Sequence, residues 1–554
     1  MNVTVETAMR EAYDLCIVGA GPAGIILALE YQRLQPGCRV LLVEFAADGH
    51  PARNPLDDSI KISNPGNHHL PYECTNKGLG GSSASWGGRC VMYDEIDFLP
   101  RNILNGQCTW DTRLLHEARR HVDAAAGYFE CGEALFNLNE MPALAGTRIA
   151  AGFLSGEVTD SVVERYSSPT RFGRRYRSQL ASSPDIHLLA GWEAHSLELS
   201  PAAETVSSLG LRDFSRARTA KINARNFALA AGGQETTRLL LKNPRVFRAR
   251  GGPPPALGRY YQGHLSGKIA SVRFRGDPAK TDYGFKRSAD AVYFRRRFQL
   301  STETLLANNL LNTALWLDNP LYFDPGHQNG AMSFMYLAMI TPGLKKWLAP
   351  PAIAHSVTRG KVTGLRRHLW NILKDFPKSL AIPAATFFSR YCRHRKLPGV
   401  FLYSPRNVYA LHFHAEQVPV PENRMELAPD GETLLIHYRY TDQDVESVIR
   451  THEVLDLWLQ KCHCGELDYW FPKAELPAAI RSMSKDGLHQ VGTTRIAATA
   501  ADGVVDTDLK VWGAKNLYVC SGSVFPTSSQ ANPTFLLGAF AVRLARHLAI
   551  HALR

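Results

Sequence analysis

Long apolar runs are missing from this sequence. No stretch reaches the roughly 18 consecutive apolar residues of a transmembrane helix, and the apolar segment Phe535–Leu548 is broken by Arg543, Arg546 and His547. The first residues, Met1–Arg10, lack a cationic start followed by an apolar block, so we expect no signal peptide. We therefore predict a cytoplasmic protein without a transmembrane helix.

Paired cysteine motifs are missing as well. The ten cysteines are scattered and none form a CxxC pair, which favours reduced thiols over a disulfide framework. The one dense group, Cys462-His463-Cys464, is too tight for an ordinary zinc site and has no second half. We predict no metal site.

Positive charge is concentrated in one segment. The chain has 554 residues, enough for about two to four domains, and with 45% hydrophobic and 21% charged residues it is not a disordered or fibrous chain. The net charge is +12, and residues 345–396 hold twelve Lys and Arg against a single acid, Asp375. The basic character is therefore local.

Apolar residues recur at helical spacing inside this segment, and basic residues occupy other faces of the same helix: Leu365, Leu369, Ile372, Leu373 and Phe376, with Arg366, Arg367 and Lys374. One interpretation is a helix packed on its own domain with a solvated basic face; the other is a basic helix in peripheral contact with an anionic membrane. We favour the first, because most amphipathic helices are ordinary surface helices. We expect no nucleic-acid partner, because no nucleic-acid-binding motif accompanies the charge.

The N-terminal residues predict a βαβ unit. Residues 13–18 (YDLCIV) predict a buried strand, Ile25–Leu34 a helix, and residues 39–43 (RVLLV) a second strand. Further strands are expected at 187–200 and 221–231.

The middle of the chain has a different pattern. Alternating stretches such as Ile269–Phe274 and Leu411–Val420 predict antiparallel strands. We predict an α/β fold in which a discontinuous Rossmann-like nucleotide-binding domain, 13–265 and 485–554, is interrupted by an α+β substrate domain, 266–484, built on an antiparallel sheet. The basic helical insert at 345–396 belongs to the second domain.

A dinucleotide-binding motif joins the first strand to its helix. Gly19 permits the tight turn, Gly21 lets the backbone approach a pyrophosphate, and Gly24 lets helix and strand pack closely. Glu44 follows at the end of the next strand, where a carboxylate can accept hydrogen bonds from ribose hydroxyls. The motif alone is compatible with FAD or NAD.

Three further segments resemble the glucose–methanol–choline (GMC) family of FAD-dependent oxidoreductases, nearer its pyranose-oxidase-like branch. They are GLGGSSASWGGRC (Gly78–Cys90), FALAAGGQETTRLLL (Phe227–Leu241), and the C-terminal sequence from HQVGTTR at His489 to SSQANPT ending at Thr534. The resemblance implies an FAD cofactor. In some pyranose-oxidase relatives a histidine before the loop tryptophan carries the flavin covalently; here that position is Ser85, so we predict non-covalent FAD. A second departure is Ser521, where many members have Asp.

The motif and the resemblance together imply a set of cofactor-contacting residues: Gly19, Gly21, Ala23, Gly24, Glu44, Gly80, Gly81, Ser82, Ser83, Trp86, Gly87, Gly88, Ala194, Ala231, Gly232, Ser523, Asn532, Pro533 and Thr534.

The resemblance also implies a catalytic pair, His489 and Asn532. A neutral imidazole can take the hydroxyl proton of an alcohol while a hydride passes to flavin N5, and an Asn amide can donate to the developing alkoxide. Many relatives have a second His at the Asn position, so His489 would be the only base. Asn532 also has a structural interpretation as the N-cap of a helix that starts at Pro533.

Weaker candidates for the substrate side are Glu416, Gln417, His412, His414 and His264, and a buried histidine is more often structural. The predicted function is oxidation of an alcohol CH–OH to a carbonyl, with a sugar, polyol or glycoside as substrate and oxygen, a quinone or another carrier as electron acceptor. Alternatives are an apolar or lipid-linked alcohol at a membrane surface, a non-redox lyase on the same scaffold, or a flavin-binding protein whose chemistry has lapsed.

Overall fold

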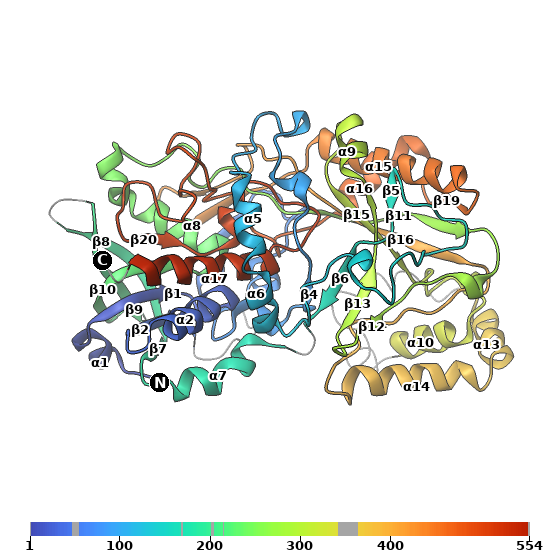
Figure 1. The fold of residues 1–554 in the computed structure, drawn as a ribbon, viewed down its shortest axis with the longest axis horizontal. Coiled ribbons are helices and arrows are strands. Elements are labelled where there is room, and N and C mark those ends of the chain that lie inside the picture. Colours follow the sequence, from blue (N-terminus) through green and yellow to red (C-terminus); the bar gives the residue numbers. More distant parts are fainter. Residues whose placement is uncertain are drawn as a thin grey trace.

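The computed structural model describes residues 2–551 except 47–54, 168–169, 201–203, 214, 216 and 342–363. Lys345, Lys346, Arg359 and Lys361 of the basic segment lie outside the described residues. Two parts lie side by side along the long axis, and both chain ends lie in the first part (Figure 1).

The first part is built on a seven-stranded sheet in the order β7-β2-β1-β10-β9-β8, with β20 on β10. The contacts of β7, β2, β1, β10 and β20 are parallel, whereas β10, β9 and β8 form an antiparallel meander. The strand bounds are β1 Tyr13–Val18, β2 Val40–Glu44, β7 Ile186–Ala190, β8 Trp192–Leu199, β9 Val206–Asp213, β10 Thr219–Leu229 and β20 Leu517–Val519.

Helices cover this sheet. The C-terminal helix α17 packs against α2, α5 and α6, so the last described residues complete the layer that the N-terminal βαβ unit begins (Figure 1). The helix bounds in this part are α1 Val5–Arg10, α2 Pro22–Leu34, α3 Pro55–Asp58, α4 Pro71–Cys74, α5 Arg113–Arg119, α6 Val122–Phe129, α7 Phe172–Ser182, α8 Gly232–Lys242 and α17 Thr534–His551.

Two glycines of the predicted motif make the β1–α2 turn possible. Gly19 has a φ of 101°, and a Cβ there would lie 2.6 Å from the carbonyl oxygen of Ala230. A Cβ on Gly24 would lie 2.0 Å from the carbonyl oxygen of Gly19. Side chains at either position would push α2 off the sheet, so this turn requires glycine.

The second part is built on a six-stranded antiparallel sheet in the order β19-β11-β16-β15-β14-β5. Two small sheets flank it: β12-β13-β6-β4, and β17-β18-β3. The strand bounds are β3 Ile60–Ile62, β4 Arg89–Cys90, β5 Val158–Thr159, β6 Val163–Tyr166, β11 Leu265–Phe274, β12 Lys286–Arg287, β13 Tyr293–Arg296, β14 Phe298–Leu300, β15 Thr313–Asp318, β16 Val408–Ala415, β17 Arg424–Leu427, β18 Leu434–His437 and β19 Gly465–Tyr469.

These sheets confirm the predicted α/β fold with an antiparallel second sheet, and they correct the predicted boundary. The range 13–265 contains β5 and β6, but β5 pairs with β14 and β6 pairs with β13. Val158 is buried in the second hydrophobic core together with Phe298. Residues near 158–166 therefore cross to the second part before the chain returns to α7.

The helices of the second part form two groups. One group, α15 Asp442–Lys461 and α16 Leu476–Met483, packs beside β19 and β11, and α9 Thr302–Ala307 lies near α15 (Figure 1). The second group consists of α10 Gly330–Ile340, α13 Leu365–Lys374 and α14 Lys378–Tyr391. In the second group α10 contacts both α13 and α14 at the edge of the molecule (Figure 1). No helix in the described ranges combines the length and apolarity needed to cross a bilayer.

The β1–α2 turn gives a stability prediction. We expect Gly24→Ala to lower the free energy of unfolding of the ligand-free protein by about 1–3 kcal/mol, because the new methyl group must displace backbone. Gly21→Ala is the matched control: its Cβ would meet no atom within 4 Å, so the change should stay within about 0.5 kcal/mol. Denaturant unfolding measures both, and equal stability of the two variants would contradict the packing role of Gly24.

Candidate active site

One continuous cavity of about 1720 Å³ extends from the carboxyl ends of β1 and β2 to the α10–α14 helices. A typical ligand pocket is about 300–1,000 Å³, so this cavity has room for more than one small molecule. Most of the predicted cofactor residues line it: Gly19, Gly21, Ala23, Glu44, Gly81, Ser82, Ser83, Trp86, Gly87, Gly88, Ala194, Ala231, Gly232, Asn532, Pro533 and Thr534.

Three predicted cofactor residues do not line the cavity. Gly24 packs α2 onto β1, and a Cβ on Gly80 would lie 2.3 Å from the backbone nitrogen of Gly173. Ser523 is fully buried, and its hydroxyl is 2.6 Å from that of Thr494. These residues shape the walls and do not face the cavity.

The nucleotide end of the cavity carries one carboxylate. Glu44 accepts hydrogen bonds from the backbone N–H of Ala20 (2.8 Å) and of Gly78 (3.0 Å). Burial raises the pKa of Glu44, against the effect of these N–H donors. The carboxylate thereby ties the β1–α2 turn to the Gly78 loop, and its remaining lone pairs can accept ribose hydroxyls.

The Gly81–Gly88 segment crosses the middle of the cavity. Its tryptophan, Trp86, donates to the carbonyl of Thr170 (2.8 Å), and its ring contacts Phe129 and Phe172. The hydroxyl of Ser85 is 2.5 Å from the side-chain nitrogen of Asn76. These contacts hold the loop in place, and Gly87 and Gly88, which have no side chains, line the cavity.

The predicted catalytic residues meet at this cavity. Asn532 Nδ2 lies 2.8 Å from His489 Nε2, so the amide donates to the lone pair of a neutral imidazole. The Asn532 Oδ1 is buried without a hydrogen-bond partner among the described residues. It does not cap α17, as the N-cap interpretation required. The first turn of the helix contains a backbone hydrogen bond from the Leu537 N–H to the Pro533 carbonyl (2.9 Å).

A buried carboxylate that the sequence analysis missed lies behind His489. Asp486 Oδ2 is 3.4 Å from His489 Nδ1 and 3.2 Å from His264 Nδ1, and the two histidine Nδ1 atoms are 3.0 Å apart. Burial would raise the pKa of Asp486, but His489 and His264 hold it well below the usual range. The available signal was an acid three residues before the base, in the sequence DGLH.

A third histidine completes the cluster. The ring of His414 stacks on that of His264, with centroids 4.1 Å apart, and His414 Nδ1 donates to the carbonyl of Gln530 at 2.8 Å. Burial lowers the pKa of both His264 and His414, which favours neutral rings. One nitrogen from each of His264, His414 and His489 lies within 4.8 Å of the others. Such a group could hold a metal ion, so our expectation of no metal stays a prediction.

A segment near the C-terminus of the chain matches a known family. Residues 419–541 match the family described as GMC oxidoreductase, in its C-terminal domain. A 6‴-hydroxyparomomycin C oxidase of Streptomyces lividus is 22% identical over 97% of this chain and 92% of its own length. The segment 419–541 therefore matches the C-terminal domain of the GMC oxidoreductases, the family that the sequence resembles. The place of the chain nearer the pyranose-oxidase-like branch stays a prediction.

Two other proteins are similar to this chain over shorter segments. A C-glycoside 3-oxidase of Arthrobacter globiformis is 34% identical over 115 residues, which are 21% of this chain and 20% of that protein. A long-chain-alcohol oxidase of Arabidopsis thaliana is 32% identical over 89 residues, 15% of this chain and 12% of that protein. Both matches cover a fifth or less of those relatives. A solved fungal aryl-alcohol oxidase shares the fold, with 15% identity, a TM-score of 0.52, and coverage of 98% of this chain and 100% of that one.

Two predicted substrate residues are structural. Glu416 is fully buried in a bidentate ion pair with Arg101 (2.6 and 2.8 Å), and Gln417 is bonded to backbone groups of Gly263 and Arg439. Neither lines the cavity, whereas His412 and His414, on β16, do. β16 ends at Ala415, so Glu416 and Gln417 lie beyond the strand that carries these two histidines.

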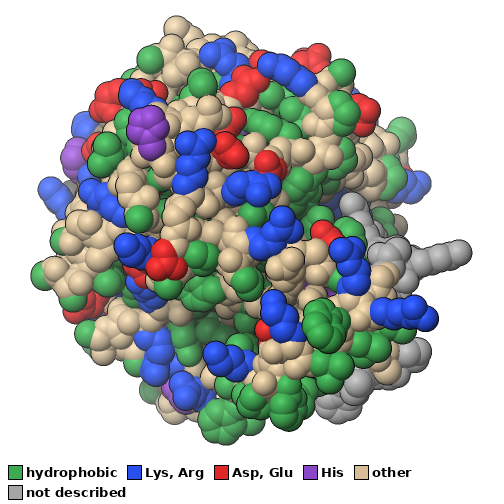
Figure 2. Space-filling view, turned by 90° about the vertical axis from the view of Figure 1, so that its right-hand side faces the viewer, with side chains coloured by type: hydrophobic (Ala, Val, Ile, Leu, Met, Phe, Trp, Pro, Cys, Tyr) green, Lys and Arg blue, Asp and Glu red, His purple; other side chains and the backbone are tan. Residues whose placement is uncertain are grey.

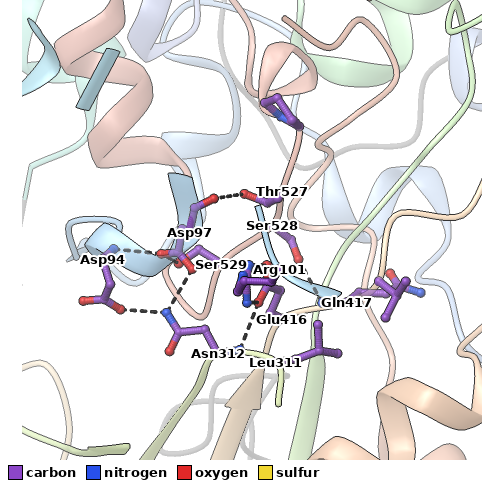
Figure 3. Close-up of polar contacts among 12 residues, drawn as sticks. Asp94, Asp97, Arg101, Leu311, Asn312, Glu416, Gln417, Thr527, Ser528 and Ser529 are labelled. Atoms are coloured by element: carbon purple, nitrogen blue, oxygen red, sulfur yellow. Dashed lines mark hydrogen bonds and ion pairs between the residues drawn. The ribbon is translucent and has the colours of Figure 1, made fainter. Parts of the chain in front are cut away.

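Glu416 belongs to a buried polar network that braces the segment before Asn532 (Figure 3). Asp97 accepts from the Ser529 hydroxyl, from Asn312 Nδ2 (3.0 Å) and from the Asp94 N–H (2.7 Å). Its own carbonyl accepts from the Thr527 hydroxyl at 3.0 Å. Burial, together with the charges of Asp94 and Glu416, raises the pKa of Asp97 to about 8. Near neutral pH this carboxyl therefore stays protonated.

The raised pKa of Asp97 predicts a pH-dependent stability. Between about pH 4, where an unfolded Asp ionises, and about pH 8, the native state holds one more proton, so the free energy of unfolding should fall as pH rises, by at most about 1.4 kcal/mol per pH unit. Asp97→Asn should flatten this slope, whereas the exposed control Asp123→Asn should keep it. Denaturant unfolding between pH 5 and 8 measures the slope, and an unchanged slope in Asp97→Asn would refute the assignment.

Proposed function

We propose that this GMC oxidoreductase binds FAD without a covalent link and oxidises an alcohol CH–OH to a carbonyl. The observation that carries the proposal is the hydrogen-bonded pair His489–Asn532, which lies in the cavity that also contains the dinucleotide motif. FAD in that cavity would supply a hydride acceptor. The chain's own residues supply the proton transfer, the orientation of the substrate and the exclusion of water.

The residues that would hold FAD fit a dinucleotide. The N-terminus of α2, which starts at Pro22, opens into the cavity, and free N–H groups at a helix start favour phosphates. Glu44 presents a carboxylate at the ribose position of the motif. Ser85 stands where covalent relatives carry histidine, and a serine hydroxyl cannot form that link, which supports a non-covalent cofactor.

His489 would be the base. Its Nε2 carries the lone pair that accepts from Asn532 in the ligand-free site. When the Asn532 amide turns to a bound substrate, this lone pair is released and can take the hydroxyl proton. The unpaired Asn532 Oδ1 can accept from the substrate, and Nδ2 can donate to an alkoxide oxygen. The side chain of His489 is only 14% exposed, so little water competes for this proton.

Asp486 and His264 would position the base. The Asp486 carboxylate faces His489 Nδ1, so a proton on Nδ1 leaves Nε2 free to act, and the negative charge stabilises the imidazolium that forms. His264 is held from the other side by the Ser528 carbonyl, 3.3 Å from its Nε2. This contact orients the His264 ring toward His489.

The substrate we favour is a sugar, polyol or glycoside. Polar groups line the cavity on the second-sheet side: Lys268 and Asp318, 2.6 Å apart, and His412, whose ring stacks on Trp316 at 4.4 Å. Several polar groups on one cavity wall suit a substrate with several hydroxyl groups. A relative that acts on a C-glycoside, by its name, supports the same class.

One observation favours a second candidate, an apolar alcohol. The far end of the cavity is lined by apolar side chains of α10 and α14, among them Phe334, Met335, Met339 and Phe387.

Anaerobic bleaching of the flavin absorbance by a pool of sugars and glycosides, compared with bleaching by a pool of aliphatic and aromatic alcohols, distinguishes the two substrate classes. Fast recovery in air would indicate oxygen as the electron acceptor, and slow recovery a quinone or other carrier. Bleaching by neither pool, with FAD bound, would count against alcohol oxidation and favour the lyase.

Replacing the base tests the proposed role. We expect His489→Ala to slow substrate-dependent flavin bleaching by about 10²–10⁴-fold while the flavin absorbance of the purified protein stays, because the base is lost but the nucleotide end is untouched. His437→Ala, outside the cavity, is the matched control and should keep the wild-type rate. A wild-type rate in His489→Ala would place the base elsewhere.

The positioning role of Asp486 makes a separate prediction. Asp486→Asn should lower kcat and leave KM within about threefold, because the charge acts on the imidazolium formed during reaction and not on the bound substrate. The exposed control, Asp468→Asn, should change neither. If KM rose while kcat held, Asp486 would instead shape the substrate site.

A further inference from the structure

Helix α13 buries its polar face and exposes its apolar face. The side chains it buries are His368, bonded to Ser333 (2.9 Å), and Asn371, bonded to the Pro325 carbonyl (3.0 Å). Its large apolar side chains point out: Trp370 is 66% exposed and Leu373 70%. As our preferred interpretation expected, α13 packs on its own part of the protein, through α10, and its basic side chains are exposed. It differs from an ordinary surface helix because it does not bury its apolar face.

The exposed apolar surface continues into α14. We call the following exposed side chains of the two helices and their connection the α13–α14 patch: Leu365, Leu369, Trp370, Leu373, Phe376, Leu380, Ile382, Phe387 and Phe388. On the face of the molecule seen in Figure 2, hydrophobic side chains are interspersed with Lys and Arg in the lower part. Single exposed apolar residues are ordinary, whereas a contiguous group on two helices indicates a binding surface.

Basic side chains are part of the same surface. At 100° per residue, Arg366 falls between Leu373 and Trp370 on the outward face of α13, and Arg367 and Lys374 flank them. Residues 364–396 hold further basic residues at Lys378, Arg390, Arg393, Arg395 and Lys396. The single acid of that range, Asp375, accepts from the Gly330 N–H at 2.6 Å, so it turns inward.

The charge decides between possible occupants. Two copies of this chain meeting through the patch would place like charges opposite each other, because a twofold interface pairs a surface with itself. An anionic bilayer offers the opposite charge together with an apolar interior, and long Lys and Arg side chains can reach its headgroups while Trp and Phe insert. The patch therefore fits a lipid surface better than a second copy.

We propose that the α13–α14 patch docks this protein peripherally on anionic lipid bilayers. Phe387 is half exposed and also lines the cavity, so the cavity reaches the surface within the patch. Docking would place that opening against the bilayer. The binding itself does not depend on the proposed reaction, so its test needs no turnover.

The test is sedimentation of the full-length flavoprotein with vesicles of phosphatidylcholine and phosphatidylserine at low salt. We expect binding that weakens with added salt and is much weaker on pure phosphatidylcholine, because the attraction is screened within a Debye length. Arg366→Glu with Arg367→Glu should lower the partition coefficient at least about 30-fold, and Leu373→Ser with Phe376→Ser should lower it on both vesicle types.

Matched controls keep this proposal falsifiable. Arg245→Glu with Arg248→Glu makes the same charge change on exposed residues of the first part, and Leu457→Ser removes another exposed apolar side chain; both should bind like the wild type. All variants are exposed, so retained flavin absorbance and circular dichroism confirm their fold. No binding by the wild type at low salt, equal loss in the controls, or a light-scattering dimer that dissociates in the Leu373→Ser, Phe376→Ser variant would each overturn the proposal.

Discussion

The site depends on two buried carboxyl groups that fix loops from distant parts of the chain. His489 and Asn532 have no helix or strand in common, so their 2.8 Å contact exists only because each loop is held separately. Asp486 holds the first loop: one oxygen accepts from the N–H groups of Gly487 (2.7 Å) and Leu488 (2.8 Å), and the other accepts from the N–H of His264 (2.6 Å). One side chain therefore joins the His489 loop to the start of β11 and also supplies the charge beside the base.

Asp97, whose pKa is raised by burial, holds the second loop. Ser529 has a φ of 59°, a left-handed conformation that costs a non-glycine residue about 1–2 kcal/mol. Its hydroxyl donates to Asp97, and Gln530, next in sequence, is bonded to Asp94 and Arg297. The left-handed Ser529 lies three positions before Asn532. The buried hydrogen bonds of Ser529 and Gln530 offset this strain. They give the charged groups around Asp97 a structural role next to the site.

Local sequence was enough to predict the first half of this arrangement. A hydrophobic run, three glycines and a following acid depend on neighbours within one βαβ unit, so β1, α2, β2 and Glu44 could be placed from spacing alone. The other half could not be predicted this way. Glu416 and Gln417 directly follow the strand that carries the cavity residues His412 and His414, but their partners, Arg101 and Gly263, come from elsewhere in the chain. A polar residue near a cavity is therefore ambiguous until its long-range partner is known.

Helix α13 shows a different limit of sequence analysis. Periodicity defines an apolar face and a polar face, but it does not say which one meets the protein, and the usual assumption is that the apolar face turns inward. That assumption fails here because α10 offers α13 a polar partner: Ser333 is fully buried and lies within hydrogen-bond distance of both His368 and Asn371. Two buried polar side chains on α13 cannot turn outward without leaving this hydroxyl unpaired, and an unpaired buried polar group costs about 1–3 kcal/mol. The hydrogen bonds to Ser333 therefore leave Trp370 and Leu373 on the exposed face of α13, where they can insert into a lipid bilayer.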